Sequence, residues 1–147
     1  MAEVQFRFRD DEAVGDPGVT VGAFGAQSNA AAVRLEPGDE ARDLLPHLAR
    51  LRLIEINFPS FGDGRGYTAA RVLREAGYTG ELRAVGDVLV DQIGFMRRCG
   101  FDAFAPEVPL DPADAQAALD RFADVYQPAA DGRVPIWAKR HGEVQGG

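Results

Sequence analysis

The sequence has little of what metal-binding, disulfide-rich and membrane proteins depend on. Its 147 residues include one cysteine, Cys99, and two histidines, His47 and His141. A single thiol excludes an internal disulfide and a multi-cysteine metal site, and the two distant imidazoles match no zinc-ligand spacing. No apolar run approaches the roughly 18 residues of a membrane helix, and the first residues do not read as a signal peptide. We therefore expect a cytoplasmic protein with no metal and no membrane partner.

Basic residues are also scarce relative to acidic ones. Lys and Arg number 16 against 23 Asp and Glu, which gives a net charge of −7. Such a surface repels phosphate backbones, so we expect no nucleic-acid partner. No Walker loop and no dinucleotide fingerprint is present, so we expect no nucleotide or flavin cofactor. The remaining composition, 46% hydrophobic and 27% charged, is typical of one globular domain.

Changes in residue pattern divide the chain into three parts. Residues 1–30 are interpreted as an N-terminal arm or hairpin, because residues 4–8 alternate as an edge strand does and small residues from Gly22 to Ala32 predict a flexible link. Residues 31–127 carry regular apolar patterns and form the predicted core domain. Residues 128–147 form a tail rich in Pro and Gly, in which Trp137 is predicted either to fold back on the domain or to anchor a partner.

The core segment alternates between strand and helix patterns. Strands are predicted at 31–35, 51–57, 82–85 and 101–104, and helices at 40–49, 68–76, 88–98 and from 111 onwards. Leu89, Ile93 and Met96 have the spacing of one buried helix face. About four βα units predict an α/β fold with a small parallel sheet. Two layouts remain open, a three-layer sandwich and half of a β/α barrel, and the half-barrel would favour a homo-oligomer through its open edges.

The turn between the second strand and its helix is the best candidate site. In open α/β sheets, ligands bind beyond the carboxyl ends of strands. Here the turn offers Asp63, Gly64, Arg65, Gly66 and Tyr67. The glycines would admit an anion to the backbone at the helix N-terminus, and the guanidinium would hold it. In the alternative interpretation Asp63 caps the helix and Arg65 pairs with a neighbouring acid.

Two further polar residues follow strands that should end at the same edge of the sheet. Asn57 ends the second strand, and Asp87 follows the third, where it is predicted to cap the next helix, to orient a ligand, or both. Glu55 and Arg83 instead lie inside apolar strands, where isolated charges are costly. We predict that they form a structural ion pair across adjacent strands. No residue has a pattern that identifies it as catalytic.

Several stretches of the chain resemble one known family, the bacterial domain of unknown function 934. They are Phe58-Pro59, Asp63-Gly64-Arg65-Gly66-Tyr67, the run from Gly80 to Leu89, Asp91-Gln92 and the run from Arg97 to Phe104. The resemblance covers roughly residues 31–140, and it departs from the family pattern at Gly62, where Ser or Thr is more usual. Members of the family are typically encoded beside sulfite reductase and are often labelled oxidoreductases. The resemblance thus implies a role beside sulfite reductase or its electron donor.

Three functions remain open at this point. The first is an accessory protein of assimilatory sulfate and sulfite reduction that acts by contact with the reductase system. The second is a small anion-binding enzyme or sensor that uses the turn from Asp63 to Tyr67. The third is a structural domain whose strand-end residues only cap helices. A bare apolar patch would favour the first, and a pocket holding Arg65 and Asp87 would favour the second.

Overall fold

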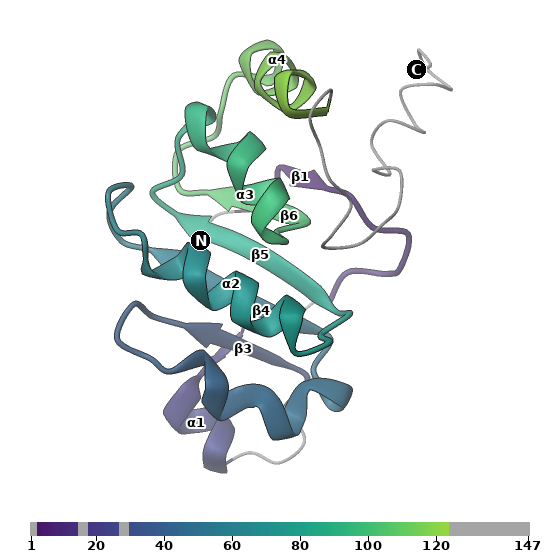
Figure 1. Ribbon diagram of the computed structural model, residues 1–147, viewed down its shortest axis with the longest axis vertical. Helices are drawn as coiled ribbons and strands as arrows, with labels where there is room; N and C mark the ends of the chain where they lie inside the picture. Colours follow the sequence, from purple (N-terminus) through teal and green to yellow (C-terminus); the bar gives the residue numbers. More distant parts are fainter. Residues whose placement is uncertain (1–2, 15–17, 27–29, 124–147) are drawn as a thin grey trace.

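A computed structural model describes residues 3–14, 18–26 and 30–123 of the chain. These residues form one six-stranded sheet in the spatial order β1-β6-β5-β4-β3-β2, with helices packed against it (Figure 1). The tail with Trp137, and with it the predicted boundary after residue 127, lies outside the described residues. The strands are β1 (Phe6–Arg7), β2 (Val19–Thr20), β3 (Ala32–Leu35), β4 (Leu53–Phe58), β5 (Glu81–Gly86) and β6 (Ala103–Pro106).

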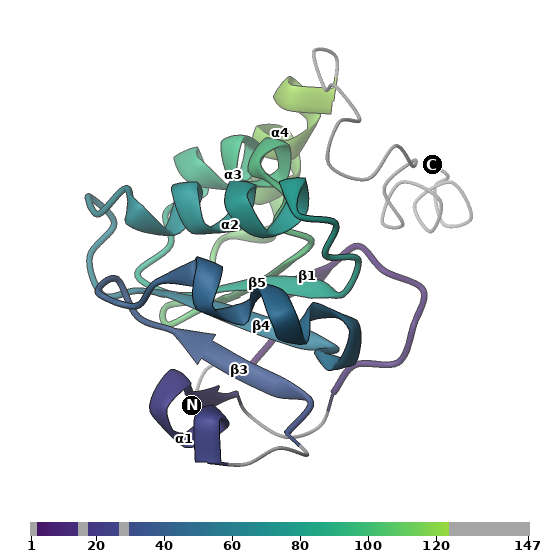
Figure 2. The same cartoon turned by 60° about the horizontal axis from the view of Figure 1, so that its bottom comes forward.

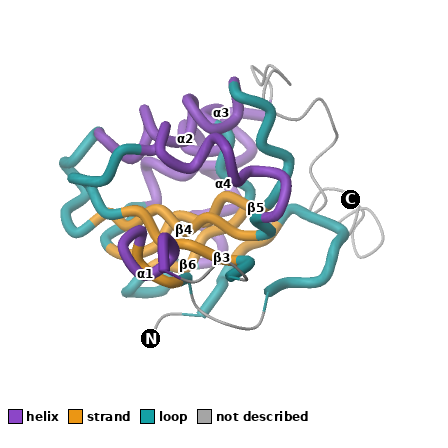
Figure 3. Tube along the Cα trace, turned by 90° about the horizontal axis from the view of Figure 1, so that it is seen from below, coloured by secondary structure: helices purple, strands orange, loops and turns teal. Residues whose placement is uncertain are grey.

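The sheet is mostly parallel, which confirms the predicted α/β fold with a parallel sheet. Strands β2 to β6 are parallel to their neighbours, with Ile54 opposite Leu82 in β4 and β5, and β1 is antiparallel to β6. Strands β2 to β6 lie side by side in chain order, so right-handed connections place their helices on one face. Figures 2 and 3 show α2, α3 and α4 together on that face. The helices are α1 (Val21–Ala26), η1 (Ala41–Arg50), α2 (Arg65–Glu75), η2 (Val90–Gln92), α3 (Ile93–Cys99) and α4 (Pro112–Ala123).

The face of the sheet under these helices is the apolar core. Side chains alternate along a strand, and in β4 the alternate residues Ile54, Ile56 and Phe58 all belong to the buried core. Helix α2 lies so close that a Cβ atom at Gly66 would stand 2.5 Å from Phe58 Cζ. The Phe58 ring also packs on Phe101, with ring centroids 5.8 Å apart. Gly66 is therefore a packing residue between α2 and β4.

The other face of the sheet carries a chain of buried charges. Glu55 on β4 accepts from Arg34 Nε at 3.4 Å and from Arg83 Nη1 at 3.3 Å. Arg83 Nη2 on β5 also pairs with Glu81 at 2.8 Å, and Arg7 Nε on β1 reaches Glu81 at 3.0 Å. Glu55, Glu81 and Arg83 are all buried. Glu55 and Arg83 thus pair across adjacent strands, inside a network with residues from four strands, β3, β4, β5 and β1.

The N-terminal segment is part of the sheet. Its strands β1 and β2 occupy opposite edges, so they do not pair as the two strands of a hairpin would. Between them, Gly18 N donates to Glu55 Oε1 at 3.2 Å, which fixes the segment to the charged face. The prediction of a flexible link after Gly22 is wrong for residues 22–26, which belong to α1. Phe24 anchors that helix because its ring is buried beneath the Arg50 guanidinium, 4.6 Å from the ring centroid.

The third predicted helix begins later than its pattern indicated. A 3₁₀ turn, η2, occupies residues 90–92, and α3 begins at Ile93. Ile93 and Met96 are buried as predicted, but Leu89 precedes both helices and its side chain is exposed. The 40–49 segment also differs from a regular α-helix: Pro46 removes a backbone donor, and η1 is a 3₁₀ helix around it.

Candidate functional site

A groove opens at the edge where the parallel strands end, which we call the carboxyl edge. Three segments line it, residues 57–59 at the end of β4, residues 86–89 at the end of β5 and residues 107–110 after β6. Its volume is about 560 Å³, which is within the usual range for ligand pockets. The groove brings together two residues predicted from the sequence, Asn57 and Asp87. The other predicted site residues, Asp63 to Tyr67, do not line it.

Asp87 fastens the neighbouring loop. Its Oδ2 accepts the Phe61 N–H at 3.1 Å, while Gln92 Nε2 donates to the Phe61 carbonyl at 2.8 Å. The capping role predicted for Asp87 is wrong, because the next helix begins at Val90 with Leu89 in the N-cap position. Gly86 makes this geometry possible: its φ is +95°, and a Cβ there would stand 2.5 Å from the Phe58 carbonyl oxygen.

Asp63 and Arg65 pair with one another. Asp63 Oδ1 accepts the Arg65 backbone N–H at 3.0 Å, and Oδ2 lies 2.8 Å from Arg65 Nη2. These hydrogen bonds lower the pKa of the Asp63 carboxyl to about 2 and raise the pKa of Arg65. The Arg65 side chain is 66% exposed. An anion arriving at this turn would meet a cation whose charge Asp63 already balances.

Of the remaining residues of the turn, Gly66 and Tyr67 pack against the core and Gly64 lies on the open surface. A Cβ at Gly64 would meet no atom within 4 Å, so that position has no steric need for glycine, whereas Gly66 is required by its contact with Phe58. Tyr67 packs between two phenylalanines, with ring centroids 5.4 Å from both Phe58 and Phe95. Burial raises the pKa of the Tyr67 hydroxyl.

The carboxyl edge is acidic. Asn57 Nδ2 donates to Glu36 Oε1 at 2.7 Å, so the amide faces a carboxylate from the loop after β3. The four connections after β3, β4, β5 and β6 span residues 36–40, 59–64, 87–92 and 107–111 and contain eight acidic side chains and no Lys, Arg or His. The acidic residues are Glu36, Asp39, Glu40, Asp63, Asp87, Asp91, Glu107 and Asp111. Electrostatically this edge favours a cationic ligand over an anionic one.

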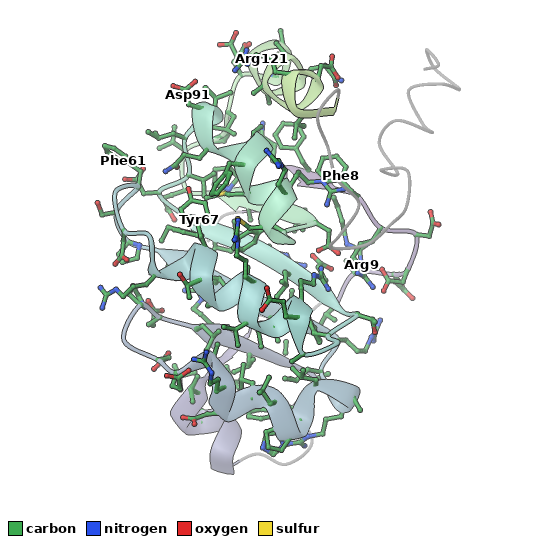
Figure 4. All side chains as sticks on the ribbon, in the orientation of Figure 1. Phe8, Arg9, Phe61, Tyr67, Asp91 and Arg121 are labelled. Atoms are coloured by element: carbon green, nitrogen blue, oxygen red, sulfur yellow. The ribbon has the colours of Figure 1, made fainter. Side chains whose placement is uncertain are left out.

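Large apolar side chains are exposed on the same edge. Phe61 is 50% exposed, Leu89 38% and Val108 75%. Leu89 and Val108 line the groove, and Phe61 stands on the loop that Asp87 holds. Figure 4 shows Phe61 pointing outward at the border of the molecule, while Tyr67 lies against the helices. The sequence offered a signal for this cluster, apolar residues in the connections that follow parallel strands, but Leu89 was assigned to a buried helix face.

Glu55 and Arg83 form the predicted ion pair on the charged face of the sheet, and neither lines the groove. Within residues 3–14, 18–26 and 30–123, no group of three or more His, Cys, Asp or Glu side chains is arranged to hold a metal ion. In the same residues, no helix is long and apolar enough to cross a membrane. Cys99 is buried.

One comparison with known proteins gives a match. The family described as bacterial protein of unknown function (DUF934) matches residues 32–137, which is more than two thirds of the chain. No curated protein and no solved structure matches.

Proposed function

This chain belongs to the DUF934 family of bacterial proteins of unknown function, and we propose that it is an accessory protein of assimilatory sulfite reduction. In this proposal it acts in the cytoplasm by contact with sulfite reductase or its electron donor. The link to sulfite reduction comes from the gene neighbourhood that the family resemblance implies. The mode of action, contact, comes from the surface of the molecule.

The proposal that the protein acts by contact rests on the exposed apolar cluster at the carboxyl edge. Phe61, Leu89 and Val108 are large side chains that remain 38–75% exposed. Leu89 and Val108 line the groove, and the backbone of Phe61 is bound by Asp87, which also lines it. Apolar side chains gathered in this way, with polar residues around them, mark sites of protein association. A partner that covers these side chains would gain about 25 cal/mol of favourable free energy per Å² of apolar surface removed from water.

The anion-binding alternative has less support from the geometry. It needs Arg65 to be available to an anion, but Asp63 occupies two of its N–H donors. It also needs Asp87 and Arg65 in one pocket, and only Asp87 lines the groove. The carboxylates nearby add repulsion.

Co-elution of the purified chain with the sulfite reductase encoded beside it tests the proposed function. Wild-type chain should elute with the reductase on gel filtration, and the double variant Leu89→Ser, Val108→Ser should elute alone. Leu45→Ser is the matched control, because Leu45 is 36% exposed but belongs to η1 and does not line the groove. Separate elution of the wild-type chain and the reductase, or co-elution of the double variant, would contradict the proposal.

A further inference from the structure

The apolar residues of the carboxyl edge stand on loops that hydrogen bonds hold in place. We call the groove, Leu89 and Val108 that line it, and Phe61 on the loop next to it the carboxyl-edge surface. Gln92 secures two of its loops, because its Oε1 accepts from Leu89 N at 3.0 Å and its Nε2 donates to the Phe61 carbonyl. A surface fixed in this way has less conformational entropy to lose when it binds.

The third loop is fixed by a residue from the N-terminal segment. Gln5 Nε2 donates to the Leu110 carbonyl at 2.7 Å, and Gln5 Oε1 accepts the Leu110 N–H at 2.9 Å. Glu107 N also donates to the Gly86 carbonyl at 2.8 Å, which ties this loop to the end of β5. Val108, between these attachments, is held outward at 75% exposure. Its exposure is therefore a feature of a fixed loop.

The charge of the surface specifies the chemistry of what covers it. Eight carboxylates and no basic side chain occupy the four connections at this edge. The cations just beyond them, Arg42 and Arg65, each pair with one of these acids, Glu40 and Asp63. An anionic segment would be repelled, whereas Lys and Arg side chains would be attracted and steered towards the edge. Apolar contact at the centre and charge at the border is the usual anatomy of a protein interface.

The dimensions of the groove set the length of the occupant. It runs across the ends of β4, β5 and β6, and neighbouring strands are ~4.8 Å apart, so the groove spans ~10 Å. An extended chain rises ~3.3 Å per residue, so three or four residues cross it. A volume of about 560 Å³ accommodates one or two large apolar side chains.

From these observations we propose that the carboxyl-edge surface binds a short, positively charged segment of the partner protein, with a large apolar residue seated in the groove and Lys or Arg side chains against the acidic loops. This inference rests on the proposed function, because the partner is taken to be the sulfite reductase system. It goes beyond that function by assigning the surface and the chemistry of the segment that binds it.

Charge reversal tests the assignment on the full chain. Glu107→Lys reverses one charge in the lining of the groove. Glu75→Lys is the matched control, because it reverses the charge of another exposed glutamate at the far end of α2. In biolayer interferometry with the purified reductase, Glu107→Lys should raise Kd about tenfold, mainly through slower association, and Glu75→Lys should change it less than about twofold. Rising salt should weaken wild-type binding more than it weakens Glu107→Lys binding. Equal Kd values for the two variants would overturn the assignment and leave the contact with the reductase standing.

If the wild-type chain does not bind the reductase, the proposed function is overturned. The assignment of the carboxyl-edge surface can still be tested in that case with a peptide probe. The probe is a synthetic peptide of residues 132–141, which carries two arginines, a lysine and a histidine, together with Ile136 and Trp137, and no acidic residue. Added to the full-length chain, it should shift the NMR signals of Phe61, Leu89 and Val108, and the same peptide with its basic residues replaced by Glu should not. No shift at millimolar peptide would overturn the assignment. Contacts of Trp137 with Val108 in the chain alone would overturn it too, since the occupant would then be this chain or a second copy.

Discussion

Removing Glu55 from the charge network on the sheet should lower the free energy of unfolding more than removing Arg83. Three arginines, Arg7, Arg34 and Arg83, contact the two buried glutamates, and Arg7 also pairs with Asp11 at 2.8 Å. Glu55 accepts from two of the arginines and from the Gly18 N–H at 3.2 Å. Each glutamate has two arginine partners, so removing Arg83 leaves both glutamates paired, whereas removing Glu55 leaves Arg34 without its carboxylate.

The contacts give the size of the difference. Arg83→Met leaves one arginine for each glutamate, Arg34 for Glu55 and Arg7 for Glu81, so we expect a loss of about 1.5–2 kcal/mol in the free energy of unfolding, the scale of a hydrogen bond to a charged group. Glu55→Met removes the acceptor from two arginines and from Gly18 N, so we expect a loss of about 3–4 kcal/mol. The larger value is a substantial part of the 5–15 kcal/mol that stabilises a typical domain.

Urea unfolding of the two variants and of the double variant measures these losses. The double variant should be more stable than the sum of the single losses predicts, because the two residues are in contact. Glu55→Gln, which keeps the shape but not the charge, should lose most of what Glu55→Met loses. If Arg83→Met lowers the free energy of unfolding as much as Glu55→Met does, the argument from the number of partners of each residue is refuted.

Three further predictions follow from the β4–α2 turn. Gly66→Ala should lower the free energy of unfolding by about 1–2 kcal/mol in urea, since its Cβ meets Phe58 and Ile56, whereas Gly64→Ala, with open space around it, should cost less. Asp63 should titrate by NMR with a pKa of about 2 instead of the ordinary 3.8. Its contact then stabilises the fold above pH 3.8 and is lost as pH falls through about 2, and an unshifted Asp63 pKa would show that Arg65 is not bound to it. Sulfite, sulfate and phosphate should leave the Tm of wild-type chain unchanged; a shift that Arg65→Ala abolishes would restore the anion-binding hypothesis.

The elements of the core could be predicted because each has a strong pattern of its own. The runs that became β4 and β5 are apolar and bounded by turns, and their strand register follows from the alternation of Ile54 and Ile56 with Glu55. The edge strand predicted from residues 4–8 is confirmed by β1 at one edge of the sheet, whereas β2 has only two residues, too few to give a period. Helix α1 contains two glycines, and it forms because Phe24 is buried beneath Arg50, a contact invisible in the sequence.

The candidate site was predicted only in part, since its organisation depends on contacts between loops. Parallel strands ending at one edge were enough to bring Asn57 and Asp87 together. The sequence could not show that Asp87 binds the backbone of Phe61, 26 residues away, instead of capping a helix. Leu89 has the spacing of a buried helix face, but Gln92 binds its backbone N–H and leaves its side chain on the surface.

Hydrogen–deuterium exchange of the chain with and without sulfite reductase tests the central claim most directly. If the protein acts by contact through its carboxyl edge, the reductase should slow exchange in residues 59–64, 87–92 and 107–111. Exchange in residues 76–80, at the opposite edge of the sheet, should not change. Protection of residues 76–80 alone, or no protection anywhere in the chain, would contradict the account.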